Sequence, residues 1–146
     1  MKARNAFTLV ELVIVILILG ILAAIAVPRL FNTSATAVDN GVKQTLGTVR
    51  DAIELYAADN AKLPGQGATP DLPADLAPYI RGPFPNCPVG NSADPDGVKY
   101  STGTTAFIGE ATPTSKGWHY KQDTGEFIIN YSGLSSVAPT VSYDKF

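Results

Sequence analysis

A single carboxylate, Glu11, stands at the edge of a long apolar stretch near the start of the chain. Sixteen uninterrupted apolar residues, 12–27, follow it directly. A charge inside a membrane helix costs on the order of 2.5–3.5 kcal/mol near the centre and less towards an end, so it marks a candidate functional site. A cut between Ala6 and Phe7 would place a new α-ammonium group four residues from Glu11. These residues indicate an ion pair between the Glu11 carboxylate and an N-terminal amine. The alternative is that Glu11 lies at the level of the lipid headgroups and has no function.

The other reactive side chains form no catalytic set. The chain has one histidine, His119, and one cysteine, Cys87. Their spacing does not support a nucleophile pair, and two such ligands do not make a zinc site. Cys87 has no partner for an internal disulfide and is interpreted as a loop thiol that could link subunits. We therefore expect a protein that is not an enzyme.

The length and net charge of the chain limit the number of domains and the kinds of partner that it can have. The chain has 146 residues, enough for one modest domain beyond the apolar stretch, and a net charge of −2. Lys and Arg are scattered singly rather than clustered, which argues against nucleic acid as a partner.

Three interpretations compete for residues 1–28. A secretory signal peptide would have the basic start that Lys2 and Arg4 supply, but its apolar stretch would be shorter than this one. A plain membrane anchor fits the 22 residues from Phe7 to Pro28, which span roughly 33 Å as a helix. Only the third interpretation, an anchor with a functional carboxylate, also accounts for Glu11.

The N-terminus resembles the prepilin-type signal of type IV pilins and pseudopilins. In that family a short basic leader ends in a small residue and is followed by Phe-Thr-Leu-Ile/Val-Glu and an apolar helix. Here the leader is MKARNA and the continuation is FTLVELVIVILILGILAAIAVPRLF. One departure is Ala6, where the family usually has Gly.

The resemblance implies roles for several residues. Prepilin peptidase would cut between Ala6 and Phe7 and methylate the amino group of Phe7. Glu11 would then pair with the N-terminal amine of a neighbouring subunit, so that each charge neutralises the other in lipid. Gly20 and Pro28 match further family positions, and the helix between them could bend or open on assembly; the alternative is that membrane helices simply tolerate both residue types.

Beyond Pro28 the pattern becomes periodic. Spacings of three and four residues predict one face of an amphipathic helix over residues 29–62; its members are Val38, Val42, Leu46, Val49, Ile53 and Tyr56. With the membrane half, residues 7–28, this makes one long helix of about fifty residues, preceded by a leader at 1–6.

Residues 63–146 predict a small, loop-rich globular part. Leu72, Leu76 and Ile80 indicate a short helix, residues 83–97 a loop, and residues 98–102 and 105–110 weak strands. The clearest signal is a β-hairpin over residues 117–133, whose buried side would hold Trp118, Tyr120, Phe127 and Ile129. We expect an α+β, pilin-like fold, with the long helix packed on a small C-terminal antiparallel sheet.

The resemblance also raises calcium as a cofactor, because pseudopilins often bind it in a loop near the sheet. Calcium takes six to eight oxygen ligands. Asp94 and Asp96 lie in one predicted loop and Asp123 in the hairpin turn. The alternative is that these are ordinary solvated turn aspartates.

The function that the resemblance implies is that of a structural subunit of a type II secretion pseudopilus, a fibre thought to drive protein export. The alternatives are a type IV pilus subunit for adhesion, motility or DNA uptake, and a membrane-anchored periplasmic binding module that uses exposed Tyr131 and Tyr143. Expected partners are further copies of the chain in a helical homopolymer, prepilin peptidase, an inner-membrane assembly platform and minor pseudopilins. The chain would cross the inner membrane once with its globular part in the periplasm, and the fibre would lie in the periplasm or at the cell surface.

Overall fold

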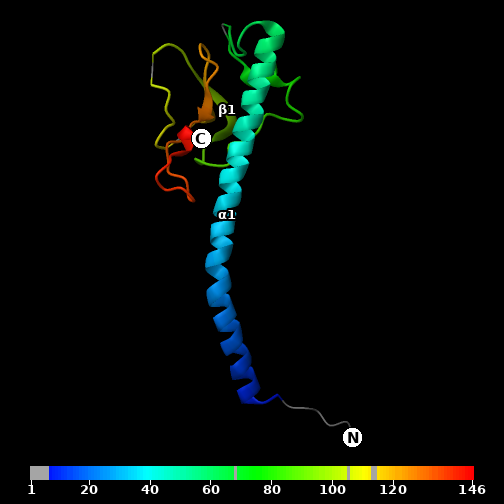
Figure 1. Cartoon of the computed structure of the whole chain (residues 1–146), viewed down its shortest axis with the longest axis vertical. Coiled ribbons are helices and arrows are strands. Elements are labelled where there is room, and N and C mark those ends of the chain that lie inside the picture. Colours follow the sequence, from blue (N-terminus) through cyan, green and yellow to red (C-terminus); the bar gives the residue numbers. More distant parts are fainter. Residues whose placement is uncertain (1–6, 68, 105, 113–114) are drawn as a thin grey trace.

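A single helix, α1 (Leu9–Asn60), runs the length of the molecule and carries every other element at one end (Figure 1). The computed structural model describes residues 7–67, 69–104, 106–112 and 115–146, with the side chains of residues 28–32 excepted. At 1.5 Å per residue the 52 residues of α1 span roughly 78 Å. The helix ends where Ala61 adopts a left-handed conformation, with φ of 51°.

The two halves of α1 differ in what they contact. From Leu9 to Val27 the helix is exposed throughout. Further along, one face is buried against the globular part; its members are Asp39, Val42, Leu46, Val49, Ala52 and Ile53. The predicted amphipathic stripe is therefore confirmed from Val42 to Ile53, whereas Val38 remains 38 % exposed.

The globular part contains one short helix, three strands and a 3-10 turn. Helix α2 (Leu72–Leu76) begins at Asp71, whose side chain accepts a hydrogen bond from the Ala74 amide. The strands are β1 (Asp94–Ser101), β2 (Lys116–Lys121) and β3 (Phe127–Ile129), and η1 (Tyr143–Lys145) follows them. The predicted short helix and hairpin are confirmed. The start of β1 corrects the prediction that the loop extends to residue 97.

The sheet has the order β1-β2-β3 and is mixed. The hairpin pair β2–β3 is antiparallel as expected, but β1 pairs with β2 in parallel. The prediction of an antiparallel sheet is therefore wrong for β1. A parallel pair needs a connection of about a dozen residues that returns along the sheet. The connection between the two strands spans residues 102–115. In the predicted strand at 105–110, the described residues 106–110 contribute an isolated bridge between Glu110 and Tyr131.

The core lies between the buried face of α1 and one face of the sheet. Trp118, Tyr120, Phe127 and Ile129 are all buried, as predicted. The rings of Trp118 and Phe127 stack with centroids 5.1 Å apart. Both polar aromatics have partners, because Trp118 Nε1 donates to the Pro85 carbonyl (2.8 Å) and the Tyr120 hydroxyl donates to the Pro64 carbonyl (3.1 Å). The α+β pilin-like fold predicted from the sequence is thus confirmed.

Candidate functional site

The N-terminal turn of α1 is closed by Thr8 and Glu11. The Thr8 amide and hydroxyl both donate to Glu11 Oε2, at 2.9 and 2.8 Å, and the Glu11 amide donates to Thr8 Oγ1 at 3.2 Å. This is a capping box, in which two otherwise unpaired amides of the first turn are satisfied. The sequence analysis missed it, although Thr-Leu-Val-Glu carries its signature. Glu11 is therefore already held at the helix end, close to Phe7.

The membrane half of α1 presents apolar side chains on every side. Its large apolar residues from Leu9 to Val27 are 46–78 % exposed. One face is hollowed around Gly20, which has no side chain to fill it; the hollow is lined by Val13, Ile16, Leu17, Gly20, Ile21 and Ala24. Small residues on a membrane helix permit a second helix to approach closely. The hollow at Gly20 would let a second helix approach closely, and the role of Gly20 in assembly stays a prediction.

The helix is continuous through Gly20 and Pro28. An opening between these two positions on assembly stays a prediction. Of the predicted cleavage site, Ala6 lies outside the described residues, whereas Phe7 is exposed at the foot of α1.

The three candidate calcium ligands do not come together. Asp94 begins β1 and forms an ion pair with Lys116, which lowers the pKa of the Asp94 carboxyl; Asp96 lies in the same strand. Asp123 lies in the β2–β3 turn, beyond the other end of β2, where its carboxylate accepts a hydrogen bond from the Gly103 amide (2.8 Å). Across the described residues, no group of three or more His, Cys, Asp or Glu side chains could hold a metal ion. The three residues do not fit the calcium site suggested by the resemblance, because the length of β2 separates Asp123 from Asp94 and Asp96.

The isolated thiol of Cys87 lies in a loop, as predicted, but it is buried. Its Sγ donates to the Val89 carbonyl at 3.3 Å. Burial raises the pKa of this thiol to about 11. Because the thiolate is the reactive form of cysteine, this burial disfavours the linking role suggested for Cys87.

The face of the sheet that points away from α1 holds a buried histidine, His119. Its Nε2 lies 3.0 Å from the Ser101 hydroxyl oxygen, and the Phe107 ring covers it with centroids 4.6 Å apart. Burial, followed by the charge of Lys99, lowers the pKa of His119. As predicted, His119 faces away from Trp118 and Tyr120. It is a neutral group beneath the 102–115 connection.

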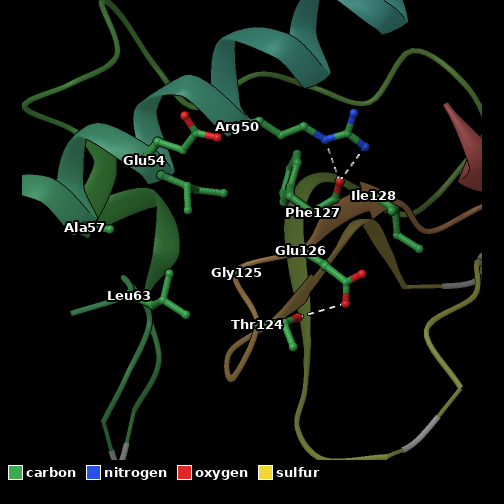
Figure 2. A pocket seen from close by; sticks show the side chains of 10 residues that line it. Arg50, Glu54, Ala57, Leu63, Thr124, Gly125, Glu126, Phe127 and Ile128 are labelled. Carbon is green, nitrogen blue, oxygen red and sulfur yellow. Dashed lines mark hydrogen bonds between the residues drawn. The ribbon is translucent and has the colours of Figure 1, made fainter. Parts of the chain in front are cut away.

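A groove of about 410 Å³ separates α1 from the β2–β3 turn (Figure 2). Arg50 lies at one end and donates from Nε and Nη2 to the Phe127 carbonyl (3.1 and 2.9 Å). Its Nη2 also donates to the main-chain oxygen of Phe146 (2.8 Å). Arg50 therefore fastens β3 and the η1 segment to the helix. The described lining contains two carboxylates, Glu54 and Glu126, and the Thr124 hydroxyl, which donates to Glu126 Oε2 at 2.8 Å, but no Cys or His.

The aromatic pair suggested for ligand binding is not exposed. Tyr143 is buried and Tyr131 is half-buried, with the two rings stacked at 6.0 Å. This corrects the expectation of two exposed tyrosines, on which the binding-module alternative relied.

The decisive comparison concerns the first helix. Residues 1–27 match the family model of the prokaryotic N-terminal methylation motif. Over 95 % of its length the chain is 29 % identical to fimbrial protein EcpC of Eikenella corrodens, with 96 % of that relative covered. The chain is thus similar to proteins of the type IV pilin and pseudopilin family. The exposed segment Leu9–Val27 is long and apolar enough to cross a membrane, and together with the matched motif it indicates membrane anchoring.

Other proteins similar to this chain are named as type II secretion proteins. The chain is 29 % identical to type II secretion system core protein G of Vibrio cholerae, over 90 % of the chain and 94 % of the relative. It is 36 % identical to the protein of the same name from Klebsiella pneumoniae, over 44 % of the chain and 46 % of the relative. No solved structure gave a significant match.

Proposed function

We propose that this protein is a structural subunit of a type II secretion pseudopilus. It is stored in the inner membrane with its globular part in the periplasm, cut between Ala6 and Phe7, and methylated at Phe7. It then polymerises to drive protein export. Its partners are further copies of itself, prepilin peptidase, an inner-membrane assembly platform and minor pseudopilins.

The observation that carries this proposal is the contrast between the two halves of α1. One half is packed into a completed core, while the other exposes apolar side chains from Leu9 to Val27. Such a surface is stable only in lipid or against other apolar helices. A helix that can exchange lipid for copies of itself is what a membrane-stored fibre subunit requires.

Glu11 supplies the register of the polymer in this proposal. Its carboxylate, held by Thr8 in the single chain, lies one turn into the helix. The methylated amine of Phe7 in a neighbouring copy would pair with it, so that two charges that are costly in lipid neutralise each other.

Processing and export test the proposal together. Intact-mass analysis of membrane extracts should show a mature chain that lacks residues 1–6 and begins with methylated Phe7. Deletion of the gene should stop export of a folded secreted protein, and the wild-type gene should restore it. A mature chain that begins at Met1, or beyond Pro28, would refute the processing step.

A type IV pilus subunit is the second candidate. EcpC, a fimbrial protein, matches nearly the full length of the chain, and type IV major fimbrial protein FimA of Dichelobacter nodosus is 44 % identical over 59 residues. If deletion abolishes surface fibres or surface motility while export continues, the pilus assignment replaces the secretion one.

A further inference from the structure

His119 lies between the sheet and the 102–115 connection. The residue is only 3 % exposed, although the described part of the connection above it lies outside the three strands. The Phe107 ring covers the imidazole, and the Ser101 hydroxyl lies 3.0 Å from its Nε2. The chain has one histidine, and histidine is the side chain whose ordinary pKa falls between about pH 5 and 8. A change of charge in mild acid is therefore expected at this covered position.

The surroundings of His119 disfavour a second proton on the ring. Its Nδ1 is buried without a well-formed hydrogen bond to the described residues. Lys99 is the register partner of His119 in the pairing of β1 with β2, so a positive charge already lies beside it. A buried charge with an incomplete set of hydrogen bonds costs free energy. The closed arrangement therefore favours the neutral imidazole.

Other groups near His119 act in the opposite direction but do not prevail. Glu110 pairs with Lys99 at 2.8 Å, and both this carboxylate and the main chain of Ile108 favour the charged ring. From β3 the register partner is the apolar Ile128. Burial and Lys99 outweigh the opposing groups, so the pKa of His119 is lowered. A second ion pair on this face lies two residues further along the strands and joins Lys121 to Glu126 at 3.8 Å.

The 102–115 connection is held to the rest of the globular part by separate contacts rather than by a strand. Its Gly103 amide donates to Asp123 (2.8 Å) and its Gly109 amide to Asp144 (3.1 Å). Most of its described residues are exposed. In Figure 1 it is the yellow loop on the side of the sheet away from α1. Exposed segments with few buried contacts open locally at a lower free energy than the core does.

We propose that protonation of His119 detaches the 102–115 connection from the sheet while the core against α1 stays folded. Lifting the Phe107 ring admits water to the imidazole, and hydration removes the cost of its charge. Mild acid thus uncovers the sheet face around His119, which the neutral protein keeps covered. This switch goes beyond the proposed function and does not depend on it, because all of its contacts lie within one chain.

The size of the response has an upper limit. Opening can at most restore the ordinary histidine pKa of 6.5. The open population at about pH 5.5 is therefore raised no more than about ten-fold over its value at neutral pH. The rise begins below about pH 6.5 and levels off once the pH has passed below the folded-state pKa.

Hydrogen exchange of the full chain in detergent, followed by mass spectrometry, tests the switch. Protection of residues 106–112 is compared at about pH 7.5 and about pH 5.5, after correction for the intrinsic exchange rate, with residues 42–53 of α1 as internal reference. We expect a several-fold loss of protection for residues 106–112 at the lower pH and none for residues 42–53. An equal loss in both segments would show global unfolding and overturn the local opening, as would unchanged protection of residues 106–112.

Three variants identify the group responsible. His119→Gln keeps a hydrogen-bonding side chain but does not titrate, so it should abolish the pH response; a response of wild-type size would overturn the role of His119. Phe107→Ala leaves the histidine but removes its cover, so protection should be low at both pH values. Ile108→Ala is the matched control, because this neighbouring side chain is 53 % exposed, and it should keep the response. Loss of the response in both alanine variants, or in neither, would overturn the role of the Phe107 ring.

Discussion

Asp39 and Tyr143, which lie 104 positions apart in the sequence, are joined by a hydrogen bond of 2.8 Å in the buried seam between α1 and the η1 segment. The Asp39 carboxylate also binds the Ser135 hydroxyl. One buried carboxylate therefore holds the loop and the η1 segment against the helix. Removing a partner from a buried group costs about 1–3 kcal/mol, because that group has already lost its water.

Tyr143→Phe should accordingly lower the free energy of unfolding by about 1–3 kcal/mol. Tyr131→Phe is the matched control, since it removes a hydroxyl from the other ring of the stacked pair, and it should cost less than about 0.5 kcal/mol. Urea unfolding of the full chain in detergent, followed by fluorescence of the single buried Trp118, measures both. Equal effects of the two variants would refute the role assigned to Asp39.

The Cys87 thiol should be inert in the folded protein. With its pKa raised to about 11 by burial, the thiolate is scarce at about pH 8, and the thiolate is the reactive form. We expect negligible reaction with a thiol-specific dye until denaturant is added, and one equivalent afterwards. Rapid labelling of the native chain would contradict this placement.

His119 should make the fold sensitive to mild acid. Its folded-state pKa is lowered from 6.5, first by burial and then by Lys99, while Glu110, paired with Lys99 at 2.8 Å, acts in the opposite direction. The unfolded chain therefore binds the proton first. The stability contributed by neutral His119 is complete above about pH 6.5 and is lost as the pH falls from there through the folded-state pKa.

The measurement is the unfolding free energy at about pH 7.5 and at about pH 5.5, on either side of the ordinary histidine pKa. The decrease between these values should be smaller in His119→Gln than in the wild-type chain. An identical decrease in both would show that other groups set the pH dependence.

Glu11→Val should leave membrane insertion intact, because it removes a charge from an apolar segment. Fibre assembly should fail or lose its register. The capping box supplies the control: Thr8→Val also breaks the cap, but it keeps the carboxylate and should still assemble. Sedimentation of sheared fibres distinguishes them, and assembly of the Glu11→Val variant at wild-type levels would exclude a register role for the carboxylate.

Calcium should not change the thermal stability of the protein. Asp94 is already paired with Lys116, and Asp123 lies beyond the far end of β2. The melting temperature should be the same in millimolar calcium and in chelator. Asp94→Ala should lower it slightly and equally in both, because a half-exposed ion pair contributes little to stability. A rise with calcium that Asp94→Ala abolishes would restore the calcium site.

The features that were predicted correctly are those that follow from a regular spacing of apolar residues along the chain. The stripe from Val42 to Ile53 and the hairpin strands at Trp118 and Phe127 each follow a regular spacing, and α1 and the β2–β3 pair have the predicted form. The charged position Glu11 was also recognisable, because a lone carboxylate in an apolar run is costly.

The features that the sequence did not predict depend on long-range pairing. Parallel pairing of β1 with β2 requires knowing that residues 102–115 return along the sheet, and nothing in their composition specifies that path. The burial of Cys87 and Tyr143 likewise depends on segments that meet only after folding. The separation of Asp94 from Asp123 follows from the same strand order, so a ligand set assembled from turn aspartates alone could not anticipate it.

The uninterrupted course of α1 from Leu9 to Asn60 has a mechanical consequence. As long as α1 stays continuous, a helix bound to the globular part through Asp39 and Arg50 transmits an axial pull along its length. In the proposed assembly, each residue of the helix drawn out of the lipid would advance the globular part by about 1.5 Å. Extraction of the anchor and displacement of the globular part are then a single movement along one coordinate, and force applied at either end is felt at the other.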